Sequence, residues 1–227
     1  TRCWRASARN CWPWRTPCAV AWSVRAVFNN AGQVCLAGSR LYVERAVFDE
    51  FLARFVRAAE SLVIGDPRDP ATQIGPLASE EHFKKVRGYL DGIGGLCVTG
   101  GIGDGWFVRP TVVVGAAHED RISREEVFGP VVVVHPFDSE REAVRLANDT
   151  PYGLNAMVFT QDLSRAHRLA ASLRAGTVWV NCFFIRDLRA PFGGVGDSGV
   201  GREGGDFSRE FFTEPKAVVM QIDRGAT

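Results

Sequence analysis

Hydrophobic residues recur every three or four positions along one long stretch of this chain, which is the spacing of one face of a helix. The stretch runs from Arg45 to Val63, and Gly65 follows it as a stop signal. The pattern predicts an amphipathic helix. Its apolar face consists of Val47, Phe48, Phe51, Leu52, Phe55, Val56, Ala59, Leu62 and Val63.

Shorter patterns of the same kind predict further helices and their limits. Ser139 and Glu142 have the spacing of a capping box, in which the two side chains satisfy backbone N–H groups at the start of a helix. Pro151 ends that helix, because the residue before a proline disfavours the helical conformation. The other predicted helices span about 19–28, 84–90 and 164–175.

Short runs of β-branched and apolar residues alternate with these helices and predict strands. The order strand–helix–strand–helix–strand over 131–181 predicts βαβαβ units, whose parallel strands are joined by right-handed crossovers. We therefore expect an α/β fold with a parallel sheet. The predicted strands are 41–43, 111–114, 131–134, 154–160 and 177–181.

Residues 1–18 differ in composition from the rest of the chain. They hold many of the cysteines and tryptophans and show no helical or strand period. They are either an irregular surface arm or residues outside the native coding sequence, for example from a shifted reading frame, and we favour the second interpretation. The predicted division is a segment 1–18, a main domain 19–210 and an arm 211–227.

The last apolar residues of the chain, 217–222, alternate in a way that is typical of a strand. A strand so close to the end of the sequence presents an open edge, and pairing with another subunit would cover it. We therefore expect a homo-oligomer that forms through this C-terminal strand.

Composition narrows the class of protein. Of 227 residues, 46% are hydrophobic and 23% are charged, which is ordinary for a globular domain. The formal net charge of +1 gives no broad basic field, so nucleic acid is not an expected partner. No apolar run approaches the roughly 20 residues of a membrane-spanning helix, and no signal peptide is recognisable. We therefore expect a cytoplasmic protein without a membrane partner.

Neither a metal site nor a dinucleotide-binding fingerprint is indicated by the spacing of residues. No two cysteines form a CxxC pair, and the histidines at 82, 118, 135 and 167 lack metal-ligand spacing. The segment 194–199 matches GxGxxG formally. It lies well beyond the preceding predicted strand, however, and further glycines oppose a helix after it. We interpret it as a loop.

Cys35 is the first candidate for chemistry. It follows a predicted helix that should break at 29–32, and it precedes the apolar run 41–43. A thiol on a tight turn between two elements is placed for reaction, provided that its environment favours the thiolate. The alternative is a structural cysteine that is buried in the core. No histidine lies near Cys35 in the sequence, so a papain-like pair finds little support.

Several segments, in order over about 20–222, resemble the aldehyde dehydrogenase superfamily. FNNAGQVCLAGSRLYVE (28–44) is similar to the cysteine signature of the family, and EEVFGPVV (125–132) is similar to its nicotinamide-ribose segment. NDTPYGLNAMVFTQD (148–162) and PFGGVGDSGVGREGG (191–205) are similar to two further family blocks. FFTEPKAVVMQI (211–222) resembles the C-terminal oligomerisation strand.

The resemblance implies a fold, a cofactor and a role for each candidate residue. The fold is a three-layer α/β catalytic domain with a C-terminal oligomerisation strand. NAD accepts the hydride while Cys35 carries the aldehyde as a thiohemiacetal and then as a thioester. Glu126 holds the nicotinamide ribose, and Phe128 lines the nicotinamide site. Asn181 lies near the substrate, and Glu203 relays protons; no metal is implied.

The loop VNCFFIRDLRAPFGG (180–194) narrows the resemblance. Together with GREGG and FFTE, it is similar to the branch that oxidises 2-hydroxymuconic semialdehyde and related semialdehydes. That likeness implies that Arg186 meets the carboxylate of the substrate, and a guanidinium suits a carboxylate bidentately. The alternative is a surface arginine that pairs with Asp187.

The sequence also departs from the family. The dinucleotide-binding domain, the general-base glutamate and the oxyanion asparagine precede the cysteine in the family, and nothing in 1–34 matches them. We therefore expect the catalytic part of a truncated protein, weak or inactive by itself. In the loop, Gly196 occupies a position where the family commonly has lysine, which bears on loop packing and subunit contacts.

Three other functions stay open at this point. A coenzyme-A-acylating semialdehyde dehydrogenase would pass the thioester to another thiol. A non-catalytic remnant would persist only as an oligomerising chain. A thiol esterase would turn over esters without NAD.

Overall fold

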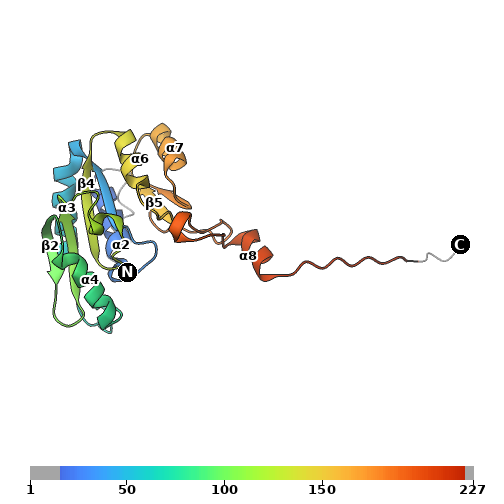
Figure 1. The fold of residues 1–227 in the computed structure, drawn as a ribbon, viewed down its shortest axis with the longest axis horizontal. Coiled ribbons are helices and arrows are strands. Elements are labelled where there is room, and N and C mark those ends of the chain that lie inside the picture. Colours follow the sequence, from blue (N-terminus) through green and yellow to red (C-terminus); the bar gives the residue numbers. More distant parts are fainter. Residues whose placement is uncertain (1–15, 223–227) are drawn as a thin grey trace.

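The computed structural model describes residues 16–222. Figure 1 shows a main body of packed helices and strands, from which the C-terminal residues extend as a long arm. The helices are α2 (Thr16–Phe28), α3 (Phe48–Glu60), α4 (Glu80–Asp91), α5 (Arg121–Arg124), α6 (Glu140–Asn148), α7 (Leu163–Ser172) and α8 (Gly205–Phe212). The strands are β1 (Arg40–Glu44), β2 (Leu96–Ile102), β3 (Val108–Val114), β4 (Val131–Phe137), β5 (Asn155–Val158) and β6 (Thr177–Val180).

Four strands form the central sheet in the order β1–β4–β3–β2. β1 and β3 both pair with β4 in parallel, with Arg40 opposite Val133 and Thr111 opposite Val131. β2 pairs with β3 antiparallel. Gly103 and Gly105 lie in the turn between the two strands, and Gly100 and Gly101 lie near the end of β2. The predicted α/β fold is confirmed, and its central sheet is parallel except for β2.

Helices cover both faces of this sheet. Val132 and Val134 of β4 pack into the apolar cluster that α2 and α3 build on one face. Val131 and Val133 pack into the cluster that α4 builds on the other face. All four side chains are at most 2% exposed. Burial on both faces explains why β4 is a continuous run of valines rather than an alternating strand.

β5 and β6 form a separate, two-stranded parallel sheet. The predicted βαβαβ unit over 131–181 is therefore correct for β5–α7–β6 and wrong for β4, which belongs to the central sheet. A strand has two hydrogen-bonding edges, and β1 and β3 occupy both edges of β4. No edge remains for β5, and the order of elements along the chain does not reveal this competition.

The capping box predicted at the start of α6 forms with one change of partner. The Ser139 hydroxyl accepts a hydrogen bond from the Glu142 N–H at 3.2 Å, as expected. The Glu142 carboxylate accepts from the N–H of Asp138 at 2.8 Å, rather than from the N–H of Ser139. Both side chains still satisfy backbone donors at the helix start.

The two ends of the described chain differ from the predicted limits. α2 begins at Thr16, so the helix overlaps the segment predicted at 1–18, and Cys18 is 2% exposed. The prediction for residues 1–15 lies outside the described residues. After α8, residues 213–222 are exposed and carry no strand pairing with any other residue of 16–222. No helix of the described part is long and apolar enough to cross a membrane.

Candidate active site

Cys35 lies in a turn between α2 and β1, and we call residues 32–37 the Cys35 turn. The Ala37 N–H donates to the Val34 carbonyl at 2.8 Å and closes the turn around the cysteine. Val34 and Leu36 pack into an apolar cluster, whereas Cys35 is a free, exposed cysteine. The alternative of a buried structural cysteine is therefore excluded, and the thiol is accessible to a reactant.

The helix break predicted at 29–32 is confirmed. Asn30, Ala31 and Gly32 have φ values of 53°, 54° and 69°, so the chain leaves the helix through left-handed backbone. Gly32 lies against another segment as well, because a Cβ atom on Gly32 would overlap the carbonyl group of Gly129. Only glycine fits this close approach and this φ together.

That contact brings the Cys35 turn next to residues 126–130, which we call the Glu126 segment. Glu126 is half-buried, and burial raises the pKa of its carboxyl, while Lys85 and Arg40 partly offset the effect. Within residues 16–222, no group donates a hydrogen bond to the Glu126 carboxylate. The neighbouring Glu125 differs, because it accepts from Tyr89 at 2.6 Å and from Arg121 at 2.9 Å.

Phe128 has an unusual backbone conformation for a large side chain, with a φ of 58°. Such left-handed residues cost about 1–3 kcal/mol and persist where the surrounding structure holds them. The Phe128 carbonyl accepts a hydrogen bond from His82 Nε2 at 2.7 Å, and the two rings lie 6.0 Å apart, edge to face. His82 therefore holds Phe128 through both its backbone and its ring.

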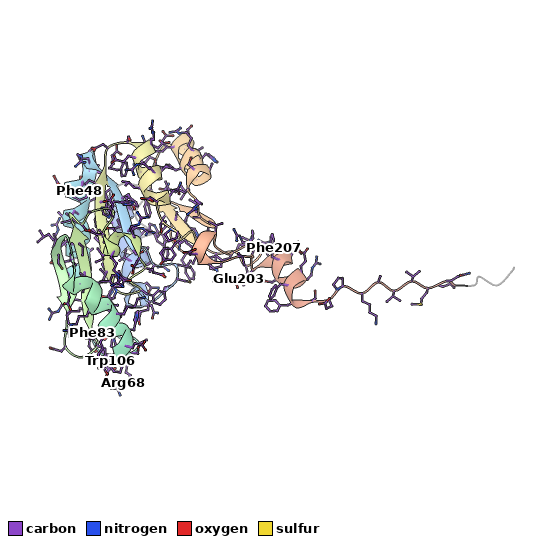
Figure 2. All side chains as sticks on the ribbon, in the orientation of Figure 1. Phe48, Arg68, Phe83, Trp106, Glu203 and Phe207 are labelled. Carbon is purple, nitrogen blue, oxygen red and sulfur yellow. The ribbon has the colours of Figure 1, made fainter. Side chains whose placement is uncertain are left out.

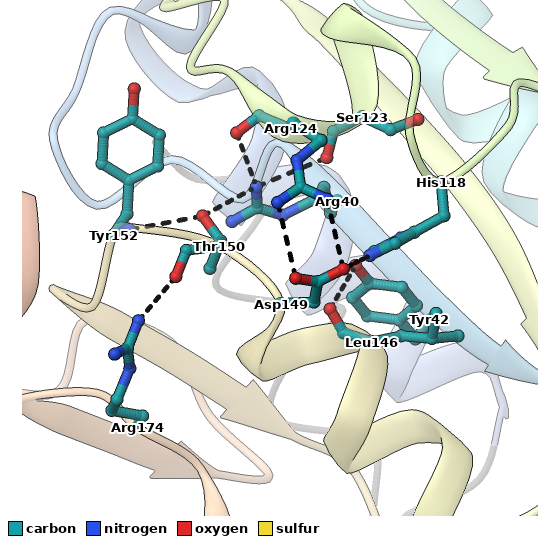
Figure 3. A network of polar contacts seen from close by, with 10 residues as sticks. All are labelled: Arg40, Tyr42, His118, Ser123, Arg124, Leu146, Asp149, Thr150, Tyr152 and Arg174. Atoms are coloured by element: carbon teal, nitrogen blue, oxygen red, sulfur yellow. Dashed lines mark hydrogen bonds and ion pairs between the residues drawn. The ribbon is translucent and has the colours of Figure 1, made fainter.

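Arg40 anchors the chain that leads into the Glu126 segment. Its Nη1 lies 3.4 Å from the carbonyls of Ser123 and Arg124 and 3.5 Å from the Thr150 hydroxyl. Figure 3 shows this guanidinium at the centre of a polar network that joins β1, the residues after α6 and the residues of α5. The network sets where the Glu126 segment starts.

Two further histidines, His118 and His135, take part in hydrogen bonding and packing. His118 contacts Asp149 at 3.1 Å, and Arg124 contacts the same carboxylate at 3.2 Å (Figure 3). His135 is 8% exposed and stacks on Tyr42. Among residues 16–222, no three His, Cys, Asp or Glu side chains gather as metal ligands do.

Asn181 directly follows β6 and has a left-handed backbone conformation, with a φ of 56°. Its side-chain amide accepts from the Thr160 N–H at 2.9 Å and donates to the Thr160 carbonyl at 2.8 Å. The amide therefore ties the end of β6 to the residues that follow β5. In this structure Asn181 fixes the loop that carries Arg186.

Arg186 lies near two aromatic rings and a carboxylate. Its guanidinium carbon is 5.6 Å from the centre of the Phe184 ring and 5.3 Å from that of Phe192. Its Nη2 is 3.8 Å from Glu203 Oε1. Cation–π contacts of this kind orient a guanidinium without using all of its N–H groups.

Asp187 does not hold Arg186. It pairs instead with Arg189, whose Nη2 lies 2.6 Å from Asp187 Oδ2. The predicted pairing of Arg186 with Asp187 is therefore wrong in this structure, whereas Arg186 is exposed at the surface as that alternative expected. The two residues are adjacent in the sequence, which suggested the pair, but Arg186 lies near Glu203 and Asp187 pairs with Arg189.

Glu203 is held by its backbone and keeps an exposed side chain. Its N–H and carbonyl exchange hydrogen bonds of 2.8 Å with the Phe192 backbone, and 64% of its side chain is exposed. Figure 2 shows Glu203 with Phe207 at the base of the arm. The carboxylate is therefore accessible to water while it faces Arg186.

One apolar cluster connects the Cys35 turn with the loop of Arg186. Within it, the Trp179 indole N–H donates to the Ile185 carbonyl at 3.0 Å and holds the start of the loop. The two parts of the candidate site are thus joined by packing. The buried members are Ala26, Leu36, Trp179 and Phe183, and Trp22, Val34, Leu154, Met157, Cys182 and Phe192 pack against them.

Sequence reasoning missed the residues that hold the site together. Arg40, His82 and Gln33 each bind the backbone of a segment distant in the chain. Gln33 Oε1 accepts from the Ala78 N–H at 2.9 Å. Its place two residues before Cys35 was the only signal that could have indicated such a role.

The fold and the accessible cysteine define an α/β domain with an exposed thiol in the turn that precedes β1. Residues 17–218 match the model of the Aldehyde dehydrogenase family, and the chain belongs to this family. The resemblance that the sequence motifs indicated is therefore confirmed.

Within this family, the chain is similar to dehydrogenases of muconic semialdehydes. The chain is 50% identical over 215 residues to a 2-hydroxymuconic semialdehyde dehydrogenase from Pseudomonas sp. (strain CF600), covering 90% of this chain and 44% of that protein. It is 43% identical to a 2-aminomuconic semialdehyde dehydrogenase from Danio rerio, covering 89% and 44%. The chain spans less than half the length of the curated relatives it matches.

A solved structure agrees with this assignment. Betaine aldehyde dehydrogenase from Staphylococcus aureus, determined in complex with NAD+, superimposes with a TM-score of 0.83 at 39% identity. The match covers 86% of this chain and 41% of that structure.

Proposed function

We propose that this chain supplies the nucleophile and part of the substrate and cofactor sites for NAD-dependent oxidation of an aldehyde to a carboxylic acid. The observation that carries the proposal is the exposed thiol of Cys35 on a tight turn directly beside the Glu126 segment. Because the curated relatives are longer than this chain, the proposal concerns the activity of the whole protein, and we expect the chain alone to be weak or inactive.

The proposed reaction begins with a bond between sulfur and carbon. The Cys35 thiolate adds to the aldehyde carbon, and the carbonyl electron pair moves to oxygen as an oxyanion. Among residues 16–222, no backbone carbonyl accepts from the Cys35 N–H, so this donor is free for the oxyanion. A donor fixed in advance can lower the barrier by a few kcal/mol, roughly 3–4 in a measured case.

The thiohemiacetal then loses hydride from the former aldehyde carbon and becomes a thioester on Cys35. NAD, when bound, supplies the hydride acceptor. Water attacks the thioester, the carboxylic acid leaves, and the thiol is regenerated. An exposed carboxylate such as Glu203 fits the proposed transfer of protons between the site and solvent, because its side chain is 64% exposed.

The residues of the Glu126 segment fit a nicotinamide cofactor. Glu126 is half-buried and receives no hydrogen bond from the described residues, so it can accept two hydroxyl donors of a ribose. Phe128 offers an apolar ring beside it, held in place by His82. We propose that Glu126 and Phe128 hold the ribose and the nicotinamide, as the resemblance implies.

The proposed substrate is a carboxylated semialdehyde such as 2-hydroxymuconic semialdehyde. Arg186 supports this choice, because its guanidinium is oriented by two rings and only loosely paired with Glu203 at 3.8 Å. A substrate carboxylate would form shorter, bidentate hydrogen bonds. Asn181 contributes by holding the loop that presents Arg186.

We further propose that the arm 213–222 pairs with a second copy of the chain. Its apolar residues are largely exposed, with Val219 at 94% and Ile222 at 80%. Extended, unpaired backbone of this composition favours strand addition. A homo-oligomer would cover both its apolar side chains and its backbone groups.

The test measures NADH formation by the purified chain with a 2-hydroxymuconic-type semialdehyde and NAD, for the wild type and for Cys35→Ser. A matched control is Cys97→Ser, which removes another exposed thiol, on β2. The proposal is supported if Cys35→Ser abolishes NADH formation and Cys97→Ser leaves it intact. That result would also show that the chain is active by itself. NADH that survives in Cys35→Ser excludes Cys35 as the nucleophile.

Two companion assays separate the alternatives. Consumption of coenzyme A would favour an acylating dehydrogenase, in which another thiol takes the acyl group from Cys35. Ester hydrolysis without NAD would favour a thiol esterase. Absence of all three reactions in the chain alone, with oligomers present, would agree both with the proposed function of the whole protein and with a non-catalytic remnant.

A further inference from the structure

We infer that His82 is a positioning residue, which holds the Glu126 segment in a fixed place beside the Cys35 turn. The inference rests on the proposed roles of Cys35, Glu126 and Phe128. It adds a residue from α4, which neither the motifs nor the comparisons connect with the site.

The first observation is the bond itself. His82 Nε2 lies 2.7 Å from the Phe128 carbonyl oxygen. A carbonyl oxygen can only accept, so Nε2 carries the proton and donates. The imidazole also meets the Phe128 ring edge to face at 6.0 Å. Two contacts on one residue fix both its backbone and its side chain.

The second observation is the backbone that this bond holds. Phe128 has a φ of 58°, a conformation that a bulky side chain rarely adopts. Without a fixed partner for its carbonyl, the peptide could relax toward ordinary φ and turn the Phe128 ring and the Glu126 carboxylate. Strained residues persist only where their surroundings determine them, and His82 is the polar group that does so here.

The third observation is that the start of α4 contacts both the Cys35 turn and the Glu126 segment. On one side, Gln33 of the Cys35 turn accepts from the Ala78 N–H at 2.9 Å. On the other side, His82 reaches Phe128, and Ser79 Oγ fixes the His82 backbone by accepting from its N–H at 3.1 Å.

The Cys35 turn and the Glu126 segment also contact each other directly, because Gly32 packs against the Gly129 carbonyl group. Three short segments, 32–35, 78–82 and 126–130, are therefore linked pairwise. If the link through His82 is lost, the Glu126 segment keeps one contact to the Cys35 turn and gains freedom to move relative to the thiol.

The test uses the full chain and three substitutions of His82. His82→Ala removes ring and donor, His82→Phe keeps the ring and removes the donor, and His82→Gln keeps a donor. His167→Ala, on the exposed face of α7, is the matched control. One readout is amide hydrogen exchange of the segment 126–130, in which Pro130 has no N–H, detected by mass spectrometry. The other is the rate at which iodoacetamide alkylates Cys35.

We expect His82→Ala and His82→Phe to speed exchange of 126–130 about five- to tenfold, the loss that corresponds to one hydrogen bond of ordinary strength. We expect the alkylation rate of Cys35 to change in the same two variants. His82→Gln should restore both readouts, and His167→Ala should match the wild type. A merely structural role for the His82 ring predicts instead that His82→Phe behaves as the wild type.

The inference is overturned if exchange of 126–130 in His82→Ala equals that of the wild type, or if His82→Phe retains wild-type exchange. Both readouts are made without NAD or aldehyde. An inactive chain with the expected exchange pattern would therefore leave the role of His82 supported, whether or not the proposed activity of the whole protein is found.

Discussion

The Arg186 guanidinium lies 3.8 Å from the Glu203 carboxylate, although the two residues come from different parts of the loop that follows β6. The backbone pairing of Glu203 with Phe192 brings them together, because the Phe192 ring also contacts Arg186. A single feature thus supplies Arg186 with a counter-charge and an aromatic surface. It leaves guanidinium N–H groups available to a second anion.

Arg186→Met should weaken the use of carboxylated aldehydes. Methionine keeps an apolar stem beside Phe184 and Phe192 but cannot donate hydrogen bonds. Hydrogen bonds to charged groups contribute about 1.5–3 kcal/mol, so we expect KM for a carboxylated semialdehyde to rise about ten- to hundredfold. An uncharged aromatic aldehyde should keep its KM.

The measurement is steady-state NADH formation by an active preparation, with both aldehydes. Arg189→Met is the control, because Arg189 pairs with Asp187 and is largely exposed. Equal losses for both aldehydes in Arg186→Met would contradict a role in carboxylate recognition.

Gly32→Ala should destabilise the chain. The new Cβ would overlap the Gly129 carbonyl, and the φ of 69° disfavours any side chain. Overpacking alone typically costs about 1–3 kcal/mol, and the left-handed backbone adds to that cost. Urea unfolding measures the difference in free energy of unfolding.

Gly88→Ala is the matched control for Gly32→Ala. Gly88 lies in α4, and apart from the neighbouring backbone of that helix no atom lies within 4 Å of the site of a Cβ. Alanine should stabilise the chain there by about 0.5–1 kcal/mol, because it has the higher helix propensity. Destabilisation of equal size at both positions would show that the Gly32–Gly129 contact is unimportant.

His135 should make the stability depend on pH. Burial, the neighbouring His118 and Arg40 lower the pKa of His135 from 6.5 to about 4, and Asp120 partly opposes this. Between these two values the unfolded chain binds more protons than the folded one, so stability rises with pH. The contribution of His135 is full above about pH 6.5, falls toward pH 4, and amounts to about 3 kcal/mol at most.

Urea midpoints between pH 7 and pH 4.5 measure this dependence, and His135→Phe is the test variant. Phenylalanine keeps an aromatic ring next to Tyr42, which stacks on His135 at 5.6 Å. His118 and Tyr42 remain as titratable neighbours in both proteins. An unchanged pH dependence in His135→Phe would assign the effect to other groups.

Val219→Asp should break the proposed oligomer. Val219 is 94% exposed in the arm, and a carboxylate there would be buried without a partner in an intersubunit sheet. Sedimentation velocity at fixed protein concentration should show the smaller species. Val63→Asp, at a 47% exposed position outside the arm, is the control and should keep the wild-type assembly. Identical sedimentation of Val219→Asp and the wild type would exclude the arm as the interface.

The sequence by itself determined most helices and strands and the reactive side chains of the candidate site. The apolar face of α3, the valine run of β4 and the break at 29–32 follow from local side-chain and backbone preferences, so they could be read directly. The motif around Cys35 carried enough specificity to indicate the family. Each of these features depends on neighbours in the chain.

Tertiary structure decided what the elements bind and which candidates meet. β4 pairs with β1 and β3, which leaves neither of its hydrogen-bonding edges for β5. Arg186 paired with Glu203 instead of the adjacent Asp187. His82 reached Phe128 from another helix. Such contacts join residues far apart in sequence, and their partners are set by packing, which no local pattern records.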